Sequence, residues 1–148
     1  MTAKEKSKPI LLLAEDADDD AFFFKRMFEK TGTSFSFHHV FNGAAAIEFL
    51  RNALKTKQLP QIIFLDLKMP LANGFDVLNW IREQKLPASM PVYILSGSEQ
   101  QEDKDRAREL GAVDYLVKPI SKNDLGRILE TVAPGSDGKN KTKRGANP

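Results

Sequence analysis

The chain has 148 residues, 41% of them apolar, and no cysteine. This length suits one domain and leaves no room for a second catalytic or DNA-binding module, and the lack of cysteine excludes disulfides and thiolate metal sites. The net charge of +2 comes from the ends, because residues 1–8 carry +2 and residues 134–148 carry +3, which leaves −3 between them and argues against direct nucleic-acid binding by a basic face.

The first half of the chain alternates short apolar runs with segments of helical periodicity. Ile10–Ala14 predicts a buried strand, and Ala17–Lys30 predicts a helix whose first turn is acidic, as the helix dipole favours. The inner side of this helix is expected to carry Phe24, Met27, Phe28 and one of Phe23 or Asp20. Phe35–Phe41 mixes polar and apolar residues and predicts an edge strand, and Ala44–Lys55 predicts the next helix.

The second half repeats the pattern with three more strands and three more helices. The expected strands are Ile62–Leu65, Val92–Leu95 and Val113–Val117, and the expected helices are one capped by Asn73, one over Glu99–Leu110 and one starting at Ser121. Glu99–Leu110 is so polar that we expect it to be the most weakly docked helix. Five strand–helix units between Pro9 and Ala133 predict an α/β domain with a parallel sheet.

The two ends of the chain are expected to lie outside this domain. Residues 1–8 predict a flexible tail, and residues 134–148 predict a disordered basic tail, because they hold too few apolar side chains to fold. The five apolar residues before Glu15 are too few for a signal peptide or a membrane span. We therefore expect a cytoplasmic protein without membrane contact, with its domain over residues 9–133.

Four of the expected strands lead directly into charged or hydroxyl residues. These are Glu15 with Asp16, Asp66, Ser96 and Lys118. Parallel strands of an open α/β sheet have their carboxyl ends on one edge, where such sheets bind ligands, so these side chains should converge. Three carboxylates form an all-oxygen site that suits Mg²⁺, whereas zinc would require His or Cys. A helix N-cap is the alternative for the doublet, but no helix begins directly after Asp66.

A carboxylate beside a divalent cation can act as a nucleophile toward a phosphoryl group and form an aspartyl-phosphate. This chemistry needs positive and hydrogen-bonding groups around the phosphoryl oxygens, which the Ser96 hydroxyl and the Lys118 ammonium would supply. Taken singly, each residue has an ordinary structural role, so the inference rests on their joint placement. A cis bond is expected between Lys118 and Pro119, because the proline directly follows a buried strand.

Together these residues resemble the receiver domain of two-component response regulators, over about Pro9 to Ala133. The matching motifs are Glu15–Asp16, the phosphoacceptor Asp66, Lys68–Met69–Pro70, Asn73–Gly74, Ser96–Gly97 and Lys118–Pro119. The resemblance implies a flavodoxin-like, doubly wound (βα)5 fold with strand order 2-1-3-4-5. It also implies that Asp16 and Asp66 bind Mg²⁺ directly, Glu15 through water, and Lys68 through its backbone carbonyl.

By the same resemblance, Asp66 accepts a phosphoryl group from a histidine kinase, and the protein catalyses only its own phosphorylation and dephosphorylation. Ser96 would move toward the phosphoryl group and Tyr115 would rotate inward behind it. This change would switch a binding face for a downstream protein, made by residues 99–110, 113–117 and the helix from Ser121. A half-buried strand aromatic is the alternative for Tyr115. The same face has enough mixed charge for a homodimer on phosphorylation, although such a charge run is also typical of a solvated surface.

Phe22 lies off the apolar side of the first helix, where an exposed Phe is unusual. In the resembled family this helix commonly docks the phosphohistidine domain of the kinase, so we hypothesise that Phe22 contacts that partner. Packing against the tail or a loop is the alternative. The Glu–Asp doublet, the acidic start of the first helix and the long link before Pro60 look like those of stand-alone regulators paired with bacteriophytochrome-type kinases.

One alternative function agrees with these residues equally well, and three others agree with fewer of them. A final output and an intermediate phosphorelay carrier are both compatible with the sequence. A phosphohydrolase would need a second acid to protonate the leaving group, often two residues after the nucleophile, where this chain has Lys68. A degenerate scaffold would not need an intact acidic pocket. Nucleotide or flavin binding would need a glycine-rich first turn, and Glu15 and Asp16 would repel a phosphate there.

Overall fold

The sheet has the strand order that the resemblance implied. The computed structural model describes residues 8–132, in which five parallel strands pair in the order β2-β1-β3-β4-β5. The strands are β1 (Ile10–Ala14), β2 (Ser36–Val40), β3 (Ile62–Asp66), β4 (Val92–Ser96) and β5 (Asp114–Val117). β3 and β4 are buried along their whole length, whereas β2 at one edge is only half-buried, as its mixed composition predicted.

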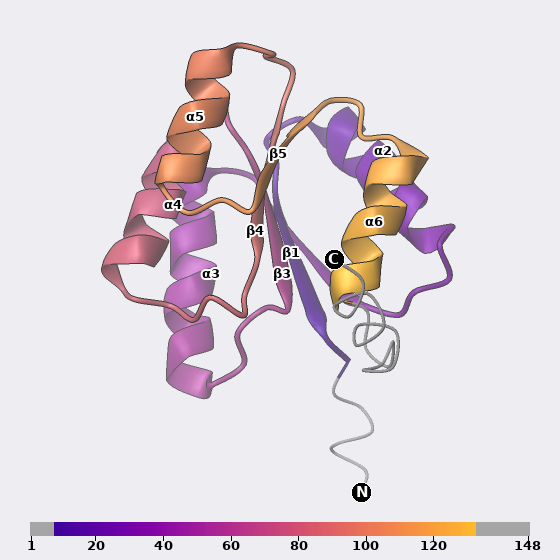
Figure 1. The fold of residues 1–148 in the computed structure, drawn as a ribbon. Coiled ribbons are helices and arrows are strands. Elements are labelled where there is room, and N and C mark those ends of the chain that lie inside the picture. Colours follow the sequence, from indigo (N-terminus) through magenta and orange to yellow (C-terminus); the bar gives the residue numbers. More distant parts are fainter. Residues whose placement is uncertain (1–7, 133–148) are drawn as a thin grey trace, which may run out of the picture.

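Helices cover both faces of this sheet (Figure 1). α2 (Asp18–Glu29) and α6 (Lys122–Val132) lie on one face, and α3 (Gly43–Thr56), α4 (Gly74–Glu83) and α5 (Gln101–Glu109) lie on the other. Each face has its own apolar core. The α2–α6 side contains an aromatic cluster in which the Phe24 ring lies 5.2 Å from that of Phe28 and 4.8 Å from that of Phe64. The doubly wound α/β fold is thus confirmed.

The inner side of α2 differs from the prediction at one position. Neither Phe23, which is 51% exposed, nor Asp20 is buried, and Ala21 takes the inner position beside Phe24 and Phe28. Successive helical residues are rotated by about 100°, so Phe23 and Phe24 cannot both face the sheet. Ala21 lies on the same side as Phe28 and is small enough to let the helix approach.

The polar helix is shorter than predicted and weakly embedded. α5 begins at Gln101 rather than Glu99, because residues 98–100 form a turn before the helix. In this turn the Ser98 hydroxyl accepts a hydrogen bond from the Gln100 N–H and donates one to the carboxylate of Asp103 in α5. Ala107 is its one buried residue. Likewise, β5 begins at Asp114, one residue later than expected.

The described residues cover the expected domain up to residue 132 and, of the two expected tails, only residue 8. Residues 1–7 and 133–148, which include nearly all of both predicted tails, lie outside the described part. Between residues 8 and 132, no helix combines the length and the apolar character needed to cross a membrane.

The loop after β3 passes very close to two glycines that begin helices. A Cβ atom on Gly43, at the start of α3, would lie 2.1 Å from the carbonyl oxygen of Ala72. A Cβ atom on Gly74, at the start of α4, would lie 2.8 Å from the carbonyl oxygen of Asp66. Both neighbours are backbone atoms of the segment that leads away from Asp66, so the two glycines allow this loop to pack beside the end of β3.

We therefore expect Gly43→Ala to destabilise the fold by about 2 kcal/mol, because the loop must shift to admit the methyl group. Urea unfolding followed by circular dichroism would measure this loss. Gly126→Ala is the matched control, since a Cβ atom at Gly126 in α6 would meet nothing within 4 Å. The control should be at least as stable as the wild type, because alanine favours a helix over glycine. Wild-type stability in Gly43→Ala would contradict the close packing.

Candidate functional site

Three carboxylates converge at the carboxyl edge of the sheet, as the sequence predicted. Glu15 and Asp16 follow β1, and Asp66 ends the neighbouring strand β3. One carboxylate oxygen from each of the three lies within 4.8 Å of the others. Glu15 is only 2% exposed and Asp66 is also buried, whereas Asp16 faces solvent. An oxygen cluster open to water on one side suits a cation that keeps part of its hydration shell, as Mg²⁺ does.

The Lys118 ammonium is held against these carboxylates. Its Nζ atom lies 2.9 Å from Glu15 Oε1, 2.9 Å from Asp20 Oδ2 and 3.3 Å from Asp66 Oδ1. Its backbone N–H donates to the Ser96 carbonyl at 2.8 Å, which ties the end of β5 to the end of β4. The Lys118–Pro119 bond is cis, as expected. Three carboxylates from two segments therefore surround one ammonium.

The pKa values of the central pair show how closely these charges interact. The pKa of the Asp66 carboxyl is raised from 3.8 to about 7, mainly by burial and then by the negative charge of Glu15, while Lys118 acts in the opposite direction. Burial by itself lowers the pKa of Lys118, but its hydrogen bonds to Glu15 and Asp20 and the charge of Asp66 raise this pKa above its ordinary value. The site has an excess of negative charge that a divalent cation would offset.

Asp20 is a site residue that the sequence pattern did not assign to the site. Helical periodicity made it a candidate for the inner side of the first helix, but its carboxylate instead reaches Lys118, 98 residues further along the chain. It lies four residues after Asp16, one helical turn further on. This spacing from the acidic doublet was the feature of the sequence that could have identified Asp20 as a site residue.

The backbone of Glu15 is fixed from both sides by β2. The Glu15 N–H donates to the carbonyl of Val40 at 3.0 Å, and the Nε2–H of His39 donates to the carbonyl of Glu15 at 2.8 Å. The side chain is fixed as well, because Glu15 Oε2 accepts a hydrogen bond from the Ala17 N–H at 3.1 Å. His39 was not predicted to take part, since nothing in a single edge strand indicates which histidine reaches across to β1.

Ser96 and Tyr115 are connected through Ser98. The buried Ser96 hydroxyl oxygen accepts a hydrogen bond from the Ser98 N–H at 3.0 Å, and the Tyr115 hydroxyl donates to the Ser98 carbonyl at 2.9 Å. Tyr115 is 7% exposed, so its ring already lies inward in this structure. The structure therefore shows the inward position of the Tyr115 ring, and not an outward position from which the expected rotation would begin. Ser98 was not singled out from the sequence, although it belongs to the Ser96–Gly97–Ser98 turn.

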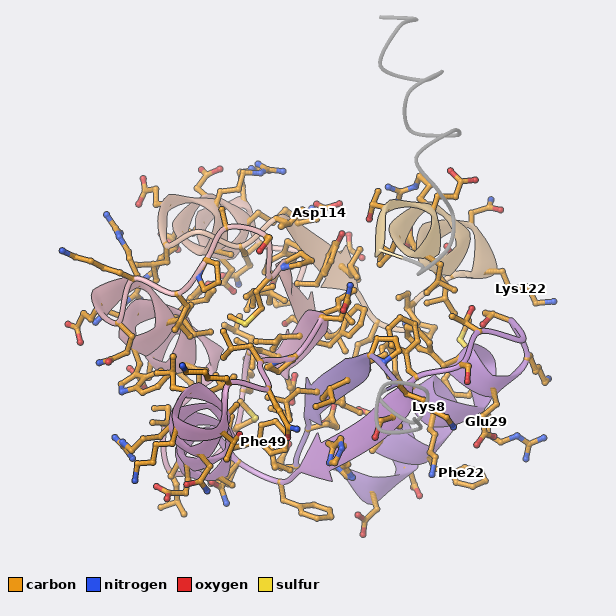
Figure 2. All side chains as sticks on the ribbon, turned by 90° about the horizontal axis from the view of Figure 1, so that it is seen from below. Lys8, Phe22, Glu29, Phe49, Asp114 and Lys122 are labelled. Atoms are coloured by element: carbon orange, nitrogen blue, oxygen red, sulfur yellow. The ribbon has the colours of Figure 1, made fainter. Side chains whose placement is uncertain are left out.

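Lys68 and Phe22 are both exposed. The Lys68 side chain faces solvent, and its carbonyl accepts no hydrogen bond from residues 8–132, which leaves the oxygen available to a cation. Phe22 is 64% exposed, as predicted, and Figure 2 shows its ring projecting from α2 on the side away from α6. The Arg26 guanidinium lies 5.8 Å from its ring centre. Phe22 thus contributes nothing to the apolar core.

Comparison with known proteins identifies relatives of this fold and sequence. The family described as response regulator receiver domain matches residues 11–130. The probable methanogenesis regulatory protein FilR2 of Methanothrix harundinacea is 33% identical, over 83% of this chain and 80% of that protein. The bacteriophytochrome response regulator AtBRR superposes with a TM-score of 0.73 at 25% identity, covering 85% of this chain and 93% of that one. The Mn²⁺-bound response regulator Rcp1 gives a TM-score of 0.69 at 27% identity, covering 84% and 93% respectively.

Proposed function

Because the chain belongs to the response regulator receiver domain family, we propose that it is a phosphorylation-controlled signalling switch whose phosphoacceptor is Asp66. The observation that carries this proposal is the placement of the Asp66 carboxylate, buried among acidic oxygens with the Lys118 ammonium 3.3 Å away. A buried carboxylate with a cation on one side has the charge environment that phosphoryl transfer requires. We assign the receiver domain to residues 9–133, with the remaining segments as tails.

Mg²⁺ is the proposed cofactor, and the residues fit it. Asp16 and Asp66 would bind it directly, Glu15 through water and Lys68 through its carbonyl oxygen. The pKa of Asp66 is raised first by burial and then by the negative charge of Glu15, and a divalent cation bound beside the carboxylate would offset both effects. When bound, Mg²⁺ offsets the charge of the phosphoryl oxygens and keeps Asp66 ionised. The relative Rcp1 was solved with Mn²⁺, a cation that prefers the same oxygen ligands.

The chain's own residues have distinct roles in the proposed transfer. An ionised oxygen of Asp66 attacks the phosphorus of a kinase phosphohistidine, so that a P–O bond forms while the P–N bond to the imidazole breaks. Lys118 binds the incoming phosphoryl oxygens, and the Ser96 hydroxyl donates to one of them. If the Ser96 oxygen moves, its hydrogen bond from Ser98 breaks, and Ser98 in turn holds the Tyr115 hydroxyl. Ser98 thus links the phosphoryl site to the switch.

The decisive experiment is incubation of the full chain with Mg²⁺ and acetyl phosphate, followed by intact-mass measurement. We expect one added phosphoryl group, located on Asp66 by fragmentation of the peptide that contains it. Chelation of Mg²⁺ should prevent the addition. A protein that gains no mass, or gains it with Mg²⁺ chelated, would contradict the proposal.

The proposed partners are a histidine kinase of the bacteriophytochrome type and a downstream protein that reads α5, β5 and α6. The likeness to AtBRR, a bacteriophytochrome response regulator, supports the kinase assignment. An intermediate phosphorelay carrier is the alternative to a final output. Transfer of the Asp66 phosphoryl group onto a histidine phosphotransfer domain would favour the carrier. A homodimer through α5, β5 and α6 is the further expectation for the phosphorylated state.

We predict that Asp20→Asn prolongs the phosphorylated state about threefold, because Asp20 competes with the phosphoryl oxygens for Lys118 and the pair is half-exposed. Loss of the adduct with time, followed by mass measurement, gives the lifetime. Asp18→Asn is the matched control, since it removes a carboxylate from the same helical turn that makes no contact with Lys118. Equal lifetimes in both variants would refute the role of Asp20.

We predict that Phe22→Ala slows phosphoryl transfer from the cognate kinase about tenfold while leaving phosphorylation by acetyl phosphate unchanged. An exposed aromatic side chain can contribute a large share of binding energy at a protein interface. Single-turnover transfer from the phosphorylated kinase measures this effect. Leu54→Ala, an exposed apolar residue on α3, is the control and should transfer at the wild-type rate. An unchanged transfer rate in Phe22→Ala would reject the contact.

A further inference from the structure

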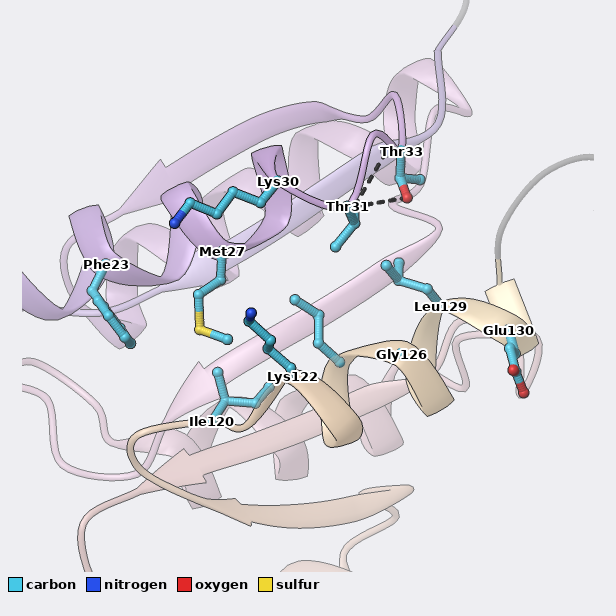
Figure 3. Close-up of a pocket in the computed structure, with 11 residues that line it drawn as sticks. Phe23, Met27, Lys30, Thr31, Thr33, Ile120, Lys122, Gly126, Leu129 and Glu130 are labelled. Atoms are coloured by element: carbon cyan, nitrogen blue, oxygen red, sulfur yellow. Dashed lines mark hydrogen bonds between the residues drawn. The ribbon is translucent and has the colours of Figure 1, made fainter.

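A groove between α2 and α6 remains open on the surface (Figure 3). It has a volume of about 870 Å³, and its apolar lining comes from both helices and the turn before α6. The apolar lining residues are Phe23, Met27, Ile120, Leu125 and Leu129. Its charged lining residues are Lys30 and Lys122, one from each side, and Glu130 of α6, so the lysines give the border a net positive charge. An occupant should therefore be apolar with acidic groups at its border.

Gly126 leaves part of the α6 wall of this groove without a side chain. It lies in the interior of α6, lines the groove and has a φ angle that any residue can adopt. A Cβ atom there would meet nothing within 4 Å, so the fold of a single copy does not require glycine. Glycine is less favourable than alanine in a helix interior, and the open space beside Gly126 leaves room for another backbone to approach α6 closely.

One outward line of α2 carries charges of opposite sign at its two ends. Asp19 and Lys30 are eleven residues apart, which is three helical turns and a rotation of roughly 20°. Phe23 and Arg26 lie between them near the same line. Lys30 caps the helix in a helical conformation, and all four side chains are exposed. Among residues 8–132, neither Asp19 nor Lys30 has an ion-pair partner.

We propose that α2 of a second copy of this chain docks over this groove in an antiparallel pair. A two-fold axis that crosses α2 between residues 24 and 25 places Asp19 opposite Lys30 of the second copy. The same axis places Phe23 opposite Arg26 of the second copy, where cation–π contact is favourable. Each contact then occurs twice, as an isologous interface requires. The acidic end of α2 from each copy then lies beside the basic side chains at the border of the other copy's groove.

This pairing would also affect the proposed phosphorylation site. Phe23 and Ile120 line both the groove and a smaller cavity of about 240 Å³ that includes Asp20 and Lys118. A helix docked over Phe23 therefore covers one approach to that cavity. The pairing limits access of a kinase to the site, so phosphoryl transfer from a protein donor proceeds through the single copy.

Charge reversal tests the pairing in unphosphorylated, metal-free protein, where failure of the proposed function has no influence. Sedimentation velocity of the full chain over a concentration series should show a reversible dimer. Asp19→Lys and Lys30→Glu should each raise the dissociation constant at least about tenfold, because each creates two like-charge contacts. An equimolar mixture of the two variants should restore the dimer, since a mixed pair contains one Lys–Glu contact and one native Lys–Asp contact.

Two further variants complete the test. Lys25→Glu reverses a charge on the other side of α2, where Lys25 lies over the Phe37 ring, and should dimerise like the wild type. Gly126→Leu fills the groove and should weaken the dimer while leaving the thermal unfolding temperature of the single copy unchanged or higher. A wild type that stays monomeric, or reversal variants that do not recover on mixing, would overturn the proposal.

Discussion

Asp66→Asn is expected to abolish phosphoryl acceptance, lowering the rate of adduct formation with acetyl phosphate by at least about a hundredfold. The amide nitrogen and oxygen carry no negative charge, so the variant has no nucleophile at the end of β3. Glu15 cannot substitute for it, because its two carboxylate oxygens already bind Lys118 and the Ala17 N–H. Intact-mass measurement after a fixed incubation with Mg²⁺ gives the result directly.

Two controls distinguish loss of the nucleophile from loss of the site. Asp16→Asn retains Asp66 but removes one expected metal ligand, so the adduct should still form, more slowly and with a higher Mg²⁺ requirement. Asp18→Asn should behave as the wild type, because Asp18 contributes to the helix N-terminus and not to the carboxylate cluster. Formation of the adduct in Asp66→Asn at the wild-type rate would place the phosphoacceptor elsewhere.

The free energy of unfolding of the metal-free protein is expected to fall as the pH rises from about 4 to about 7. Asp66 has a pKa of about 7 in the folded state against 3.8 ordinarily, so between these values the folded protein keeps a proton that the unfolded chain has released. A group whose pKa is higher in the folded state stabilises the fold fully at pH values below its unfolded-state pKa. This stabilisation is lost as the pH rises through the folded-state pKa. The loss amounts to as much as about 4 kcal/mol.

Lys118 does not oppose this trend within that pH window. Its pKa is raised above the ordinary value in the folded state, so its stabilising contribution is present throughout and is lost only at much more alkaline pH. Asp66→Asn should therefore flatten the decline and be more stable than the wild type at pH 8, because the amide is uncharged beside Glu15. Urea unfolding at several pH values, with a chelator present, measures both effects.

Magnesium supplies the complementary measurement. Addition of Mg²⁺ at pH 8 should raise the unfolding temperature of the wild type, because a ligand that binds only the folded state stabilises it. The increase should be much smaller in Asp66→Asn, which has lost a ligand and a unit of negative charge. A wild type whose stability does not change between pH 4 and pH 7 would contradict the raised pKa of Asp66.

The fold was predictable because its signals are local and repeated. The wholly apolar runs that became β1, β3 and β4 could be recognised without knowledge of any contact, and the glycines after α2 and α5 marked where those helices end. Prediction was weaker where periodicity allows two answers. In α2, three consecutive phenylalanines left the inner position open, and Ala21 took it because only one of any two successive residues faces the sheet.

The core of the candidate site was predictable for a topological reason. In a parallel sheet every strand ends on the same edge, so Glu15, Asp66, Ser96 and Lys118 had to lie along one edge, and the strand order that the resemblance implied places their strands side by side. Their individual hydrogen bonds did not follow from that rule. The contact of Lys118 with Asp20 depends on how α2 is placed against the β5–α6 turn, and the link from Ser96 to Tyr115 depends on the fold of the Ser98 turn.

The sequence by itself thus determined the succession of strands and helices along the chain and the edge on which the polar residues gather. It also determined the family resemblance, which follows from the joint pattern of those residues. Only the tertiary structure decided that Asp20 shares Lys118 with Glu15, that Tyr115 lies inward, and that α2 and α6 leave a groove between them. The division has a physical reason. Hydrophobic periodicity is set by neighbours along the chain, whereas ion pairs, rotamers and grooves depend on the separation of elements far apart in sequence.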